Sequence, residues 1–364
     1  MASIVVSGDV LRRPHGSNLA THLHYLIGLR KLGHDIVYLE DRGAPHEGEP
    51  VVPRAGLVLL ADLLRRCRVD VPVVWVDPDA GLVGGMVWPQ LRRRLERADL
   101  LLDLGGHCWL EERVLPRRRV LVDVESRTAP LGADRQLDHD MWFSYRRDPH
   151  VLPDADWLPT IPPVVPRLWY GPPPRAELPP RVRVNTAGAP PGPGEDGECG
   201  DSSEQLLALP DRISSRPWMA LPAVGTPPAA KLEEAGFSLR DEAELDASLS
   251  SYKGAMIGSL ALLSLVAGGT EAGLWFEPLD ACFLAAARPV ITTDPDLDTW
   301  LSTGVGLIAI ASLDEAPAAI ERVQADVPRH AAAARSLAAR VFHFRVVLPS
   351  LLEQALPRRL EAVA

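Results

Sequence analysis

The residues best suited to acid–base chemistry lie in and just after the loop that follows the first expected strand. Asp9 and His15 belong to this loop, and His22 lies in the helix after it. A carboxylate or an imidazole within hydrogen-bond reach of a hydroxyl group can take its proton as a general base. We therefore predict Asp9 and His15 as catalytic residues. The alternatives are that His15 is an exposed loop residue and that His22 packs its ring beside the helix.

Two later strands are also expected to end in polar residues. The segment 103–107 reads DLGGH, and the segment 123–125 reads DVE. Ligands of open α/β sheets gather at the carboxyl ends of the strands. We therefore predict that His107 and Glu125 line a ligand cleft, with an ordinary loop role as the alternative for each.

A glycine-rich turn, GGTEAG at residues 268–273, precedes a helix that Pro278 is expected to begin. Glycine lets backbone N–H groups approach a phosphate closely, and a helix N-terminus attracts anions. An ordinary strand–helix loop is the alternative. The candidate binding residues of this second site are Gly268, Gly269, Thr270, Glu277, Asp280 and Asp294. As a carboxylate at the helix start, Glu277 is expected to cap the helix and to compete with a phosphate for it.

Strands and helices alternate along the chain, as in parallel sheets covered on both faces. Residues 4–8 form a short strand, and a helix capped by Ser17 or Asn18 runs from there to about Leu32. Residues 36–39 form the next strand. These elements make one βαβ unit with a right-handed crossover.

Length and proline content predict two domains. The chain has 364 residues, which is too long for one compact core. We expect an N-terminal domain over 1–150 and a second domain over 181–330. Residues 151–180 are rich in proline, which fits neither a helix interior nor a central strand, and form the connection. Residues 331–364 form C-terminal helices, interrupted at Pro349, that pack back on the first domain.

Composition excludes several classes of partner and indicates a location. The net charge of −10 argues against nucleic acid and against an anionic membrane. The longest apolar run, residues 256–267, is shorter than the ~20 residues that span a bilayer. The four cysteines are scattered without a CxxC pair, and the first residues do not read as a leader peptide. We expect a cytoplasmic protein, and its oligomeric state stays open.

Both ends of the chain resemble bacterial GT-B glycosyltransferases. The opening IVVSGDVLRRPHGSNLATHLHYLIGLRKLGHDIVYLEDRG resembles their N-terminal domain, and LWFEPLDACFLAAARPVITTDPDLDTWLSTGVGLIAIASLDEAPAAIERV resembles their donor-binding domain. The resemblance implies an α/β fold of the GT-B type, with two Rossmann-like domains whose parallel sheets face a central cleft. It also implies that the first domain binds the acceptor, near His107 and Glu125, and the second a nucleotide sugar.

The expected function is transfer of a sugar from a nucleotide-sugar donor to a small-molecule acceptor, with no cofactor and no metal. The pair Asp77-Pro78-Asp79 has the Asp-x-Asp spacing of a cation site, but it lies in the half expected to bind the acceptor. The donor half departs from its relatives, with Glu271 where they commonly have Arg, Glu277 where Ser is usual and Cys282 where many have Glu. The alternative is therefore a decayed GT-B relative that acts as a non-enzymatic partner or scaffold.

Overall fold

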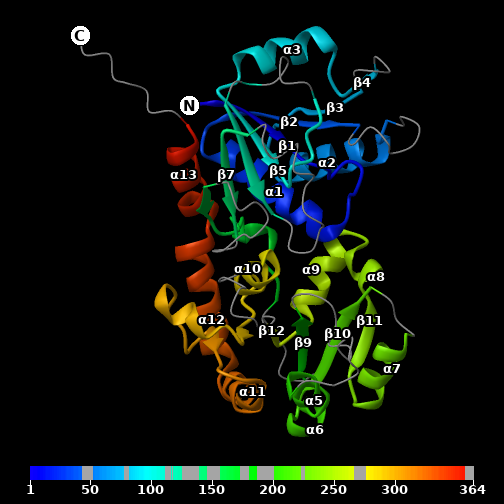
Figure 1. Ribbon diagram of the computed structural model, residues 1–364, viewed down its shortest axis with the longest axis vertical. Helices are drawn as coiled ribbons and strands as arrows, with labels where there is room; N and C mark the ends of the chain where they lie inside the picture. The colour runs from blue at the N-terminus through cyan, green and yellow to red at the C-terminus, as the bar shows by residue number, and fades with distance from the viewer. Residues whose placement is uncertain are drawn as a thin grey trace, which may run out of the picture. The chain divides into compact units, whose positions relative to one another are not determined.

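The computed structural model describes residues 1–42, 52–77, 82–110, 116, 118–124, 139–145, 156–172, 180–186, 201–222, 226–265 and 276–356. The chain divides into two compact units (Figure 1). The first comprises Met1–Val165 and His343–Ala364, and the second comprises Pro166–Phe342. The first unit thus extends into the proline-rich segment 151–180, and the chain returns to it at His343.

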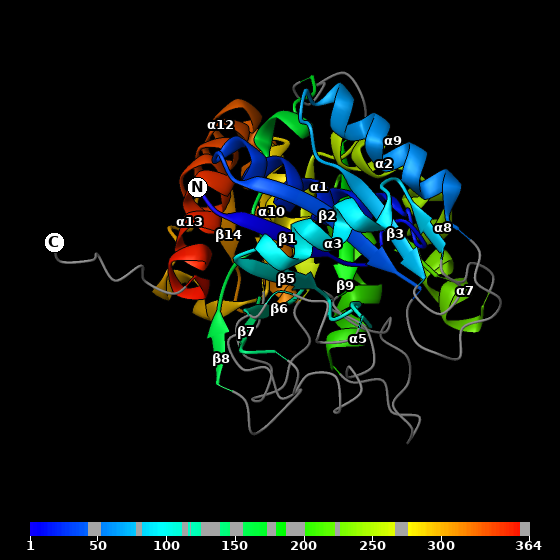
Figure 2. The same cartoon turned by 90° about the horizontal axis from the view of Figure 1, so that it is seen from above.

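The sheet of the first unit has the strand order β4-β3-β2-β1-β5-β6-β7-β8 (Figure 2). All described neighbours are parallel except β3 and β4. The strands are β1 (Ser3–Ser7), β2 (Asp35–Asp41), β3 (Val73–Asp77), β4 (Leu82–Gly84), β5 (Leu100–Leu104), β6 (Arg119–Asp123), β7 (Met141–Ser144) and β8 (Trp157–Pro159). The strands β1, β3 and β5 are largely buried and consist mostly of apolar residues, as expected for strands covered on both faces.

Four helices of this unit are described: α1 (Gly16–Lys31), α2 (Arg54–Arg66), α3 (Trp88–Arg97) and α13 (Phe344–Ala355). The last helix packs against α1 at a glycine. A Cβ added to Gly28 would lie 2.5 Å from Cδ1 of Leu348 and 2.9 Å from Cβ of Phe344, so only glycine allows this approach. The chain after His343 therefore belongs to the core of the first unit.

The prediction that Pro349 interrupts the C-terminal helix is wrong. Pro349 lies inside α13, and the interruption falls between α12 (Val327–Leu337) and α13. The proline removes one backbone hydrogen bond, to the carbonyl of Arg345. Both residues lie on the exposed side of the helix, where water can bind that carbonyl.

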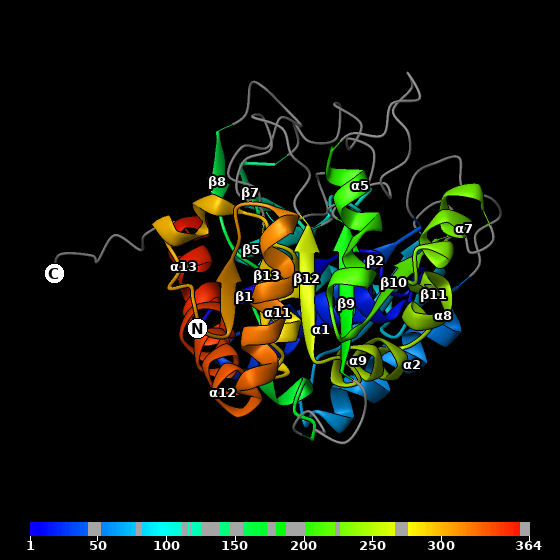
Figure 3. The same cartoon turned by 90° about the horizontal axis from the view of Figure 1, so that it is seen from below.

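The sheet of the second unit is wholly parallel in its described part, with the order β11-β10-β9-β12-β13-β14. Its strands are β9 (Arg181–Thr186), β10 (Arg216–Leu221), β11 (Ser238–Asp241), β12 (Ala261–Leu265), β13 (Val290–Thr292) and β14 (Leu307–Ala309). The remaining helices are α5 (Asp201–Leu207), α6 (Leu209–Arg212), α7 (Pro227–Glu234), α8 (Glu242–Asp246), α9 (Leu249–Ile257), α10 (Pro278–Ala285) and α11 (Ala316–Ala325). One face of the sheet forms an apolar core with α5, α6, α7 and α11 (Figure 3).

Candidate active site

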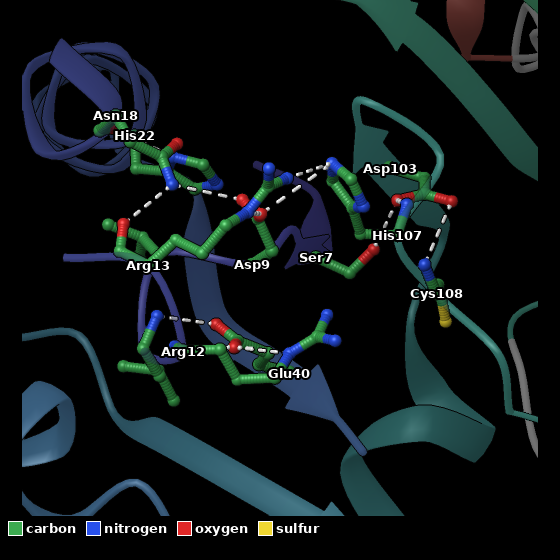
Figure 4. A network of polar contacts seen from close by, with 12 residues as sticks. Ser7, Asp9, Arg12, Arg13, Asn18, His22, Glu40, Asp103, His107 and Cys108 are labelled. Carbon is green, nitrogen blue, oxygen red and sulfur yellow. Dashed lines mark hydrogen bonds and ion pairs between the residues drawn. The ribbon is translucent and has the colours of Figure 1, made fainter. Parts of the chain in front are cut away.

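The first site lies where the order of the first sheet reverses. From β1 the chain proceeds to β2 and β3 on one side, and then crosses to β5 on the other side. Ligands of open α/β sheets bind at the carboxyl ends of the strands at such a switch point. Ser7 at the end of β1 pairs with Asp103 at the end of β5. The loops that follow these two strands bring Asp9 and His107 together (Figure 4).

Asp9 is a buried carboxylate with partners on both oxygens. Its side chain is 2% exposed, and Oδ2 forms an ion pair with Nε of Arg13. Nδ2 of Asn18 donates to Oδ1 over 3.0 Å. Nε2 of His107 lies 3.8 Å from Oδ2. The loop after β1, the first turn of α1 and the loop after β5 therefore meet at the Asp9 carboxylate.

The surroundings keep Asp9 ionised. Burial by itself raises the pKa of the carboxyl group, but the charges of His107, His22 and Arg13 and the hydrogen bond from Asn18 outweigh it. The pKa of Asp9 therefore lies below its ordinary value. A carboxylate with a lowered pKa is a weak base near neutral pH and a strong partner for a cation.

The loop that carries Asp9 is anchored by a second buried carboxylate, Glu40 on β2. Glu40 accepts hydrogen bonds from the backbone N–H groups of Leu11, at 2.6 Å, and Arg12, at 2.9 Å. The guanidinium of Arg12 and the hydroxyl of Tyr38 also donate to it, at 3.0 and 2.9 Å. Burial raises the pKa of Glu40 to about 7 against the opposing effect of these donors.

Glycine is required beside the site at Gly8, where the helix α1 comes close. A Cβ there would lie 2.0 Å from Nε2 of His22. His22 is buried, and its Nδ1 lies 2.9 Å from the carbonyl oxygen of Asn18. Its ring therefore packs against the backbone that leads from β1 to Asp9.

Arg13 also contacts the ring of His107. Nη2 of Arg13 lies 3.2 Å from Nε2 of His107. A guanidinium only donates hydrogen bonds, so this contact is a hydrogen bond when Nε2 carries no proton. His107 is 19% exposed and Arg13 is 46% exposed, so solvent and ligands can reach this contact.

Removal of this guanidinium is expected to raise the pKa of His107. In an Arg13→Gln protein the Asp9 carboxylate becomes the nearest charge to the imidazole, and we expect a rise of about one unit or more. NMR titration of the ring measures it. Arg12→Gln is the matched control, because Arg12 pairs with Glu40. An unchanged or lower pKa in Arg13→Gln would contradict the assigned contact.

The other histidine of the loop, His15, is placed differently. It is the N-cap residue of α1, it is exposed, and its side chain makes no capping hydrogen bond. The predicted capping residues Ser17 and Asn18 lie inside α1 instead, and Asn18 holds Asp9. Glu125 lies outside the described residues.

The second sheet has its own switch point, between β9 and β12. Near the carboxyl end of β9, Nδ2 of Asn185 donates to Oε2 of Glu277 over 2.9 Å. On β12, Oγ of Ser264 donates to Oδ2 of Asp280 over 3.3 Å. The prediction that Glu277 caps α10 is wrong, since its side chain makes no capping hydrogen bond and turns to the strand instead. Two of the predicted binding residues thus share this site.

Burial sets the charges of the second site. It raises the pKa of Asp280 well above its ordinary value, and the neighbouring charge of Glu277 adds to the shift. Arg183 on β9 is also buried, and its guanidinium stacks on the Trp218 ring at 5.2 Å. Burial and the Glu277 charge therefore both favour the protonated form of Asp280.

Asp294 is buried two residues beyond β13, which is one strand removed from the switch point. Gly268, Gly269, Thr270 and Glu271 lie outside the described residues. In the part of the chain that is described, no group of three or more His, Cys, Asp or Glu side chains is arranged to hold a metal ion. Within that part, no helix has the length and apolar character needed to cross a bilayer.

No protein-family model and no curated protein matches the sequence. Several solved structures match nearly the whole chain. The glycosyltransferase AviGT4, involved in avilamycin A biosynthesis, is 16% identical with a TM-score of 0.51, over 98% of this chain and 97% of that chain. An α-glucosyltransferase in complex with UDP-glucose and DNA is 9% identical with a TM-score of 0.59, over 97% of this chain and 98% of that chain. The chain has the GT-B fold.

The GT-B fold confirms the predicted α/β class, and it is compatible with more than one activity. A putative UDP-N-acetylglucosamine 2-epimerase from Listeria monocytogenes is also similar, at 12% identity and a TM-score of 0.50 over 97% of each chain. Identities of this size show the fold alone. The activity has to be argued from the side chains at the two switch points of the GT-B units.

Sequence reasoning did not assign several residues of these sites. Their types gave no distinct signal, because each is an ordinary polar residue within a helix, a strand or a loop: Asn18, Glu40, His139, Arg183, Asn185 and Ser264. Arg183 and Ser264 could have been noticed from the sequence. Each is a polar residue between apolar neighbours in an expected strand, and a buried polar side chain needs a hydrogen-bond partner.

Proposed function

We propose that the protein transfers a glycosyl group from a nucleotide sugar to a hydroxyl group of a small-molecule acceptor. The observation that carries the proposal is the ionised, buried Asp9 beside the accessible imidazole of His107 at the first switch point. A base next to a fixed carboxylate suits abstraction of a hydroxyl proton. The proposal is supported by the GT-B fold, which the α-glucosyltransferase in complex with UDP-glucose shares.

In the proposed reaction His107 is the base. The acceptor hydroxyl replaces Arg13 as the hydrogen-bond partner of Nε2 and gives its proton to this nitrogen. The acceptor oxygen forms a bond to the anomeric carbon, and the bond from that carbon to the diphosphate breaks with its electron pair leaving on the phosphate. The Asp9 carboxylate stabilises the imidazolium that forms, since opposite charges at this distance attract strongly when water is excluded.

The donor is proposed to bind the second unit at the switch point of β9 and β12. Glu277 and Asp280 are proposed to offer hydrogen-bond acceptors for the ribose hydroxyl groups of the nucleotide. Because the Glu277 side chain turns to Asn185 and does not cap α10, the leaving diphosphate is proposed to bind at the positive N-terminal end of this helix. Backbone dipoles then stabilise the leaving group, and the reaction needs no metal and no cofactor.

Calorimetric titration with UDP, ADP and GDP tests the donor site. We expect at least one of them to bind the wild-type protein. The Glu277→Ala protein should bind it about tenfold or more weakly, because a hydrogen bond to a charged group contributes roughly 1.5–3 kcal/mol. Glu233→Ala, on the exposed side of α7, is the matched control. If none of the three nucleotides binds the wild-type protein, the proposal fails, and a non-enzymatic partner role takes its place.

A further inference from the structure

A further buried carboxylate, Asp103, lies next to His107, and the proposed reaction does not use it. Asp103 is completely buried at the end of β5. It accepts hydrogen bonds from Oγ of Ser7 at 2.9 Å and from Nε2 of His139 at 3.2 Å. The backbone N–H groups of His107, at 3.1 Å, and Cys108, at 3.4 Å, also donate to it. A single carboxylate thus joins β1, β5 and the loop after β5 (Figure 4), and through His139 it also holds the segment before β7.

These contacts make Asp103 a stable negative charge inside the unit. Burial raises the pKa of the carboxyl group, but the hydrogen bond and charge of His139, the hydrogen bond from Ser7 and the charge of His107 outweigh it. Asp103 is thus held in place by one imidazole, one hydroxyl group and two backbone N–H groups.

Asp103 also shapes the turn that carries His107. Gly105 and Gly106 have φ angles of +79° and +71°, in the left-handed region that favours glycine. The Asp103 carboxylate binds the two backbone N–H groups that follow this turn. A Cβ on Gly105 would lie 2.9 Å from Cδ2 and Nε2 of His107, so the ring lies over this glycine. The position of the imidazole thus depends on the turn that Asp103 closes.

We propose that Asp103 is the positioning residue for His107, fixing its turn through the amides and increasing its basicity through the buried negative charge. The expected effect on turnover rests on the proposed function. The expected effects on the position and the pKa of the His107 ring do not depend on it. Among the described residues, Asp9 and Arg13 from the loop after β1 and Asp103 from β5 contact His107. His22 acts on the same Asp9 carboxylate, and His139 on the same Asp103 carboxylate. Asp103 binds the backbone N–H of His107.

The test is an Asp103→Asn substitution read by NMR titration of the His107 ring in full-length protein. Loss of the charge is expected to lower the pKa of His107 by about half a unit or more, opposite in sign to the rise expected for Arg13→Gln. Asp99→Asn is the matched control, because Asp99 is an exposed aspartate before the same strand. His107→Gln assigns the signal.

Kinetics give the second readout. If the protein transfers a sugar, Asp103→Asn should lower kcat by about tenfold or more, through a less basic and less ordered imidazole, with KM for the donor unchanged. If Asp103→Asn does not fold, His139→Leu replaces it, because this variant keeps the Asp103 carboxylate and removes one of its hydrogen-bond donors. It should also lower kcat, and His139→Gln, which can still donate a hydrogen bond, should lower kcat less. An unchanged His107 pKa in folded Asp103→Asn overturns the inference, and so does an unchanged kcat in His139→Leu. Absence of any nucleotide binding or turnover in the wild-type protein overturns the proposed function, and the titration still decides the role of Asp103.

Discussion

Replacement of His107 by glutamine is expected to lower the turnover number of glycosyl transfer by roughly 10²- to 10⁴-fold, the usual contribution of a general base. Glutamine is similar in size and forms hydrogen bonds, but it cannot take the acceptor proton. Asp9→Asn should also reduce turnover, because the imidazolium then lacks its carboxylate 3.8 Å away. Steady-state kinetics with the nucleotide sugar identified by calorimetry measure both losses.

Two comparisons make this result specific. Nucleoside diphosphate affinity should stay unchanged in both variants, since the residues proposed to bind the donor belong to the second unit. The same kinetic measurement on His15→Ala decides between the two histidines. A large loss in His15→Ala with normal turnover in His107→Gln would assign the base to His15, in place of the pair described here.

Gly306→Ala is expected to destabilise the second unit by about 3 kcal/mol or more. Gly306 has a φ of +81°, which costs an L residue roughly 1–2 kcal/mol. A Cβ there would also lie 2.4 Å from the backbone nitrogen of Ala334 in α12, and such overlap adds about 1–3 kcal/mol. The backbone N–H of Gly306 donates to Nδ1 of His330 over 3.2 Å, so any shift of the turn strains this bond as well.

Gly304 provides the matched control for this substitution. It has a φ of +101°, but a Cβ there meets nothing within 4 Å. Gly304→Ala should therefore lower the stability only by the roughly 1–2 kcal/mol that a positive φ costs an L residue. Hydrogen exchange at β13 and β14, followed by mass spectrometry, reports the local free energy of opening in both proteins. Equal destabilisation by the two substitutions would show that the close approach of α12 contributes nothing.

The strand and helix pattern of the first unit could be predicted from the sequence. The segment from Ile4 to Asp41 has apolar β-branched strands around a helix, and the structure has β1, α1 and β2 there. This works because burial on both faces of a parallel strand requires a continuous apolar run, which is a local property. Helix ends were less predictable, since His15 rather than Ser17 or Asn18 precedes α1.

The sequence also indicated Asp9 and His107 as candidate site residues near strand ends, but it offered several other candidates of the same kind. What selects them is the parallel pairing of β1 with β5, in which Ser7 lies opposite Asp103. This pairing places two loops next to each other that are far apart along the chain. No local pattern encodes it, because the order of strands in a sheet depends on which helices and strands pack together.

The charges of the sites were likewise decided by the tertiary structure. Glu277 was expected to cap α10 with its side chain and instead accepts a hydrogen bond from Asn185, while burial raises the pKa of Asp280 well above its ordinary value. The sequence alone determined which residues carry ionisable groups and roughly where each strand ends. Their protonation and partners follow only from the fold, because desolvation and neighbouring charges shift a pKa, and both depend on atoms from distant segments.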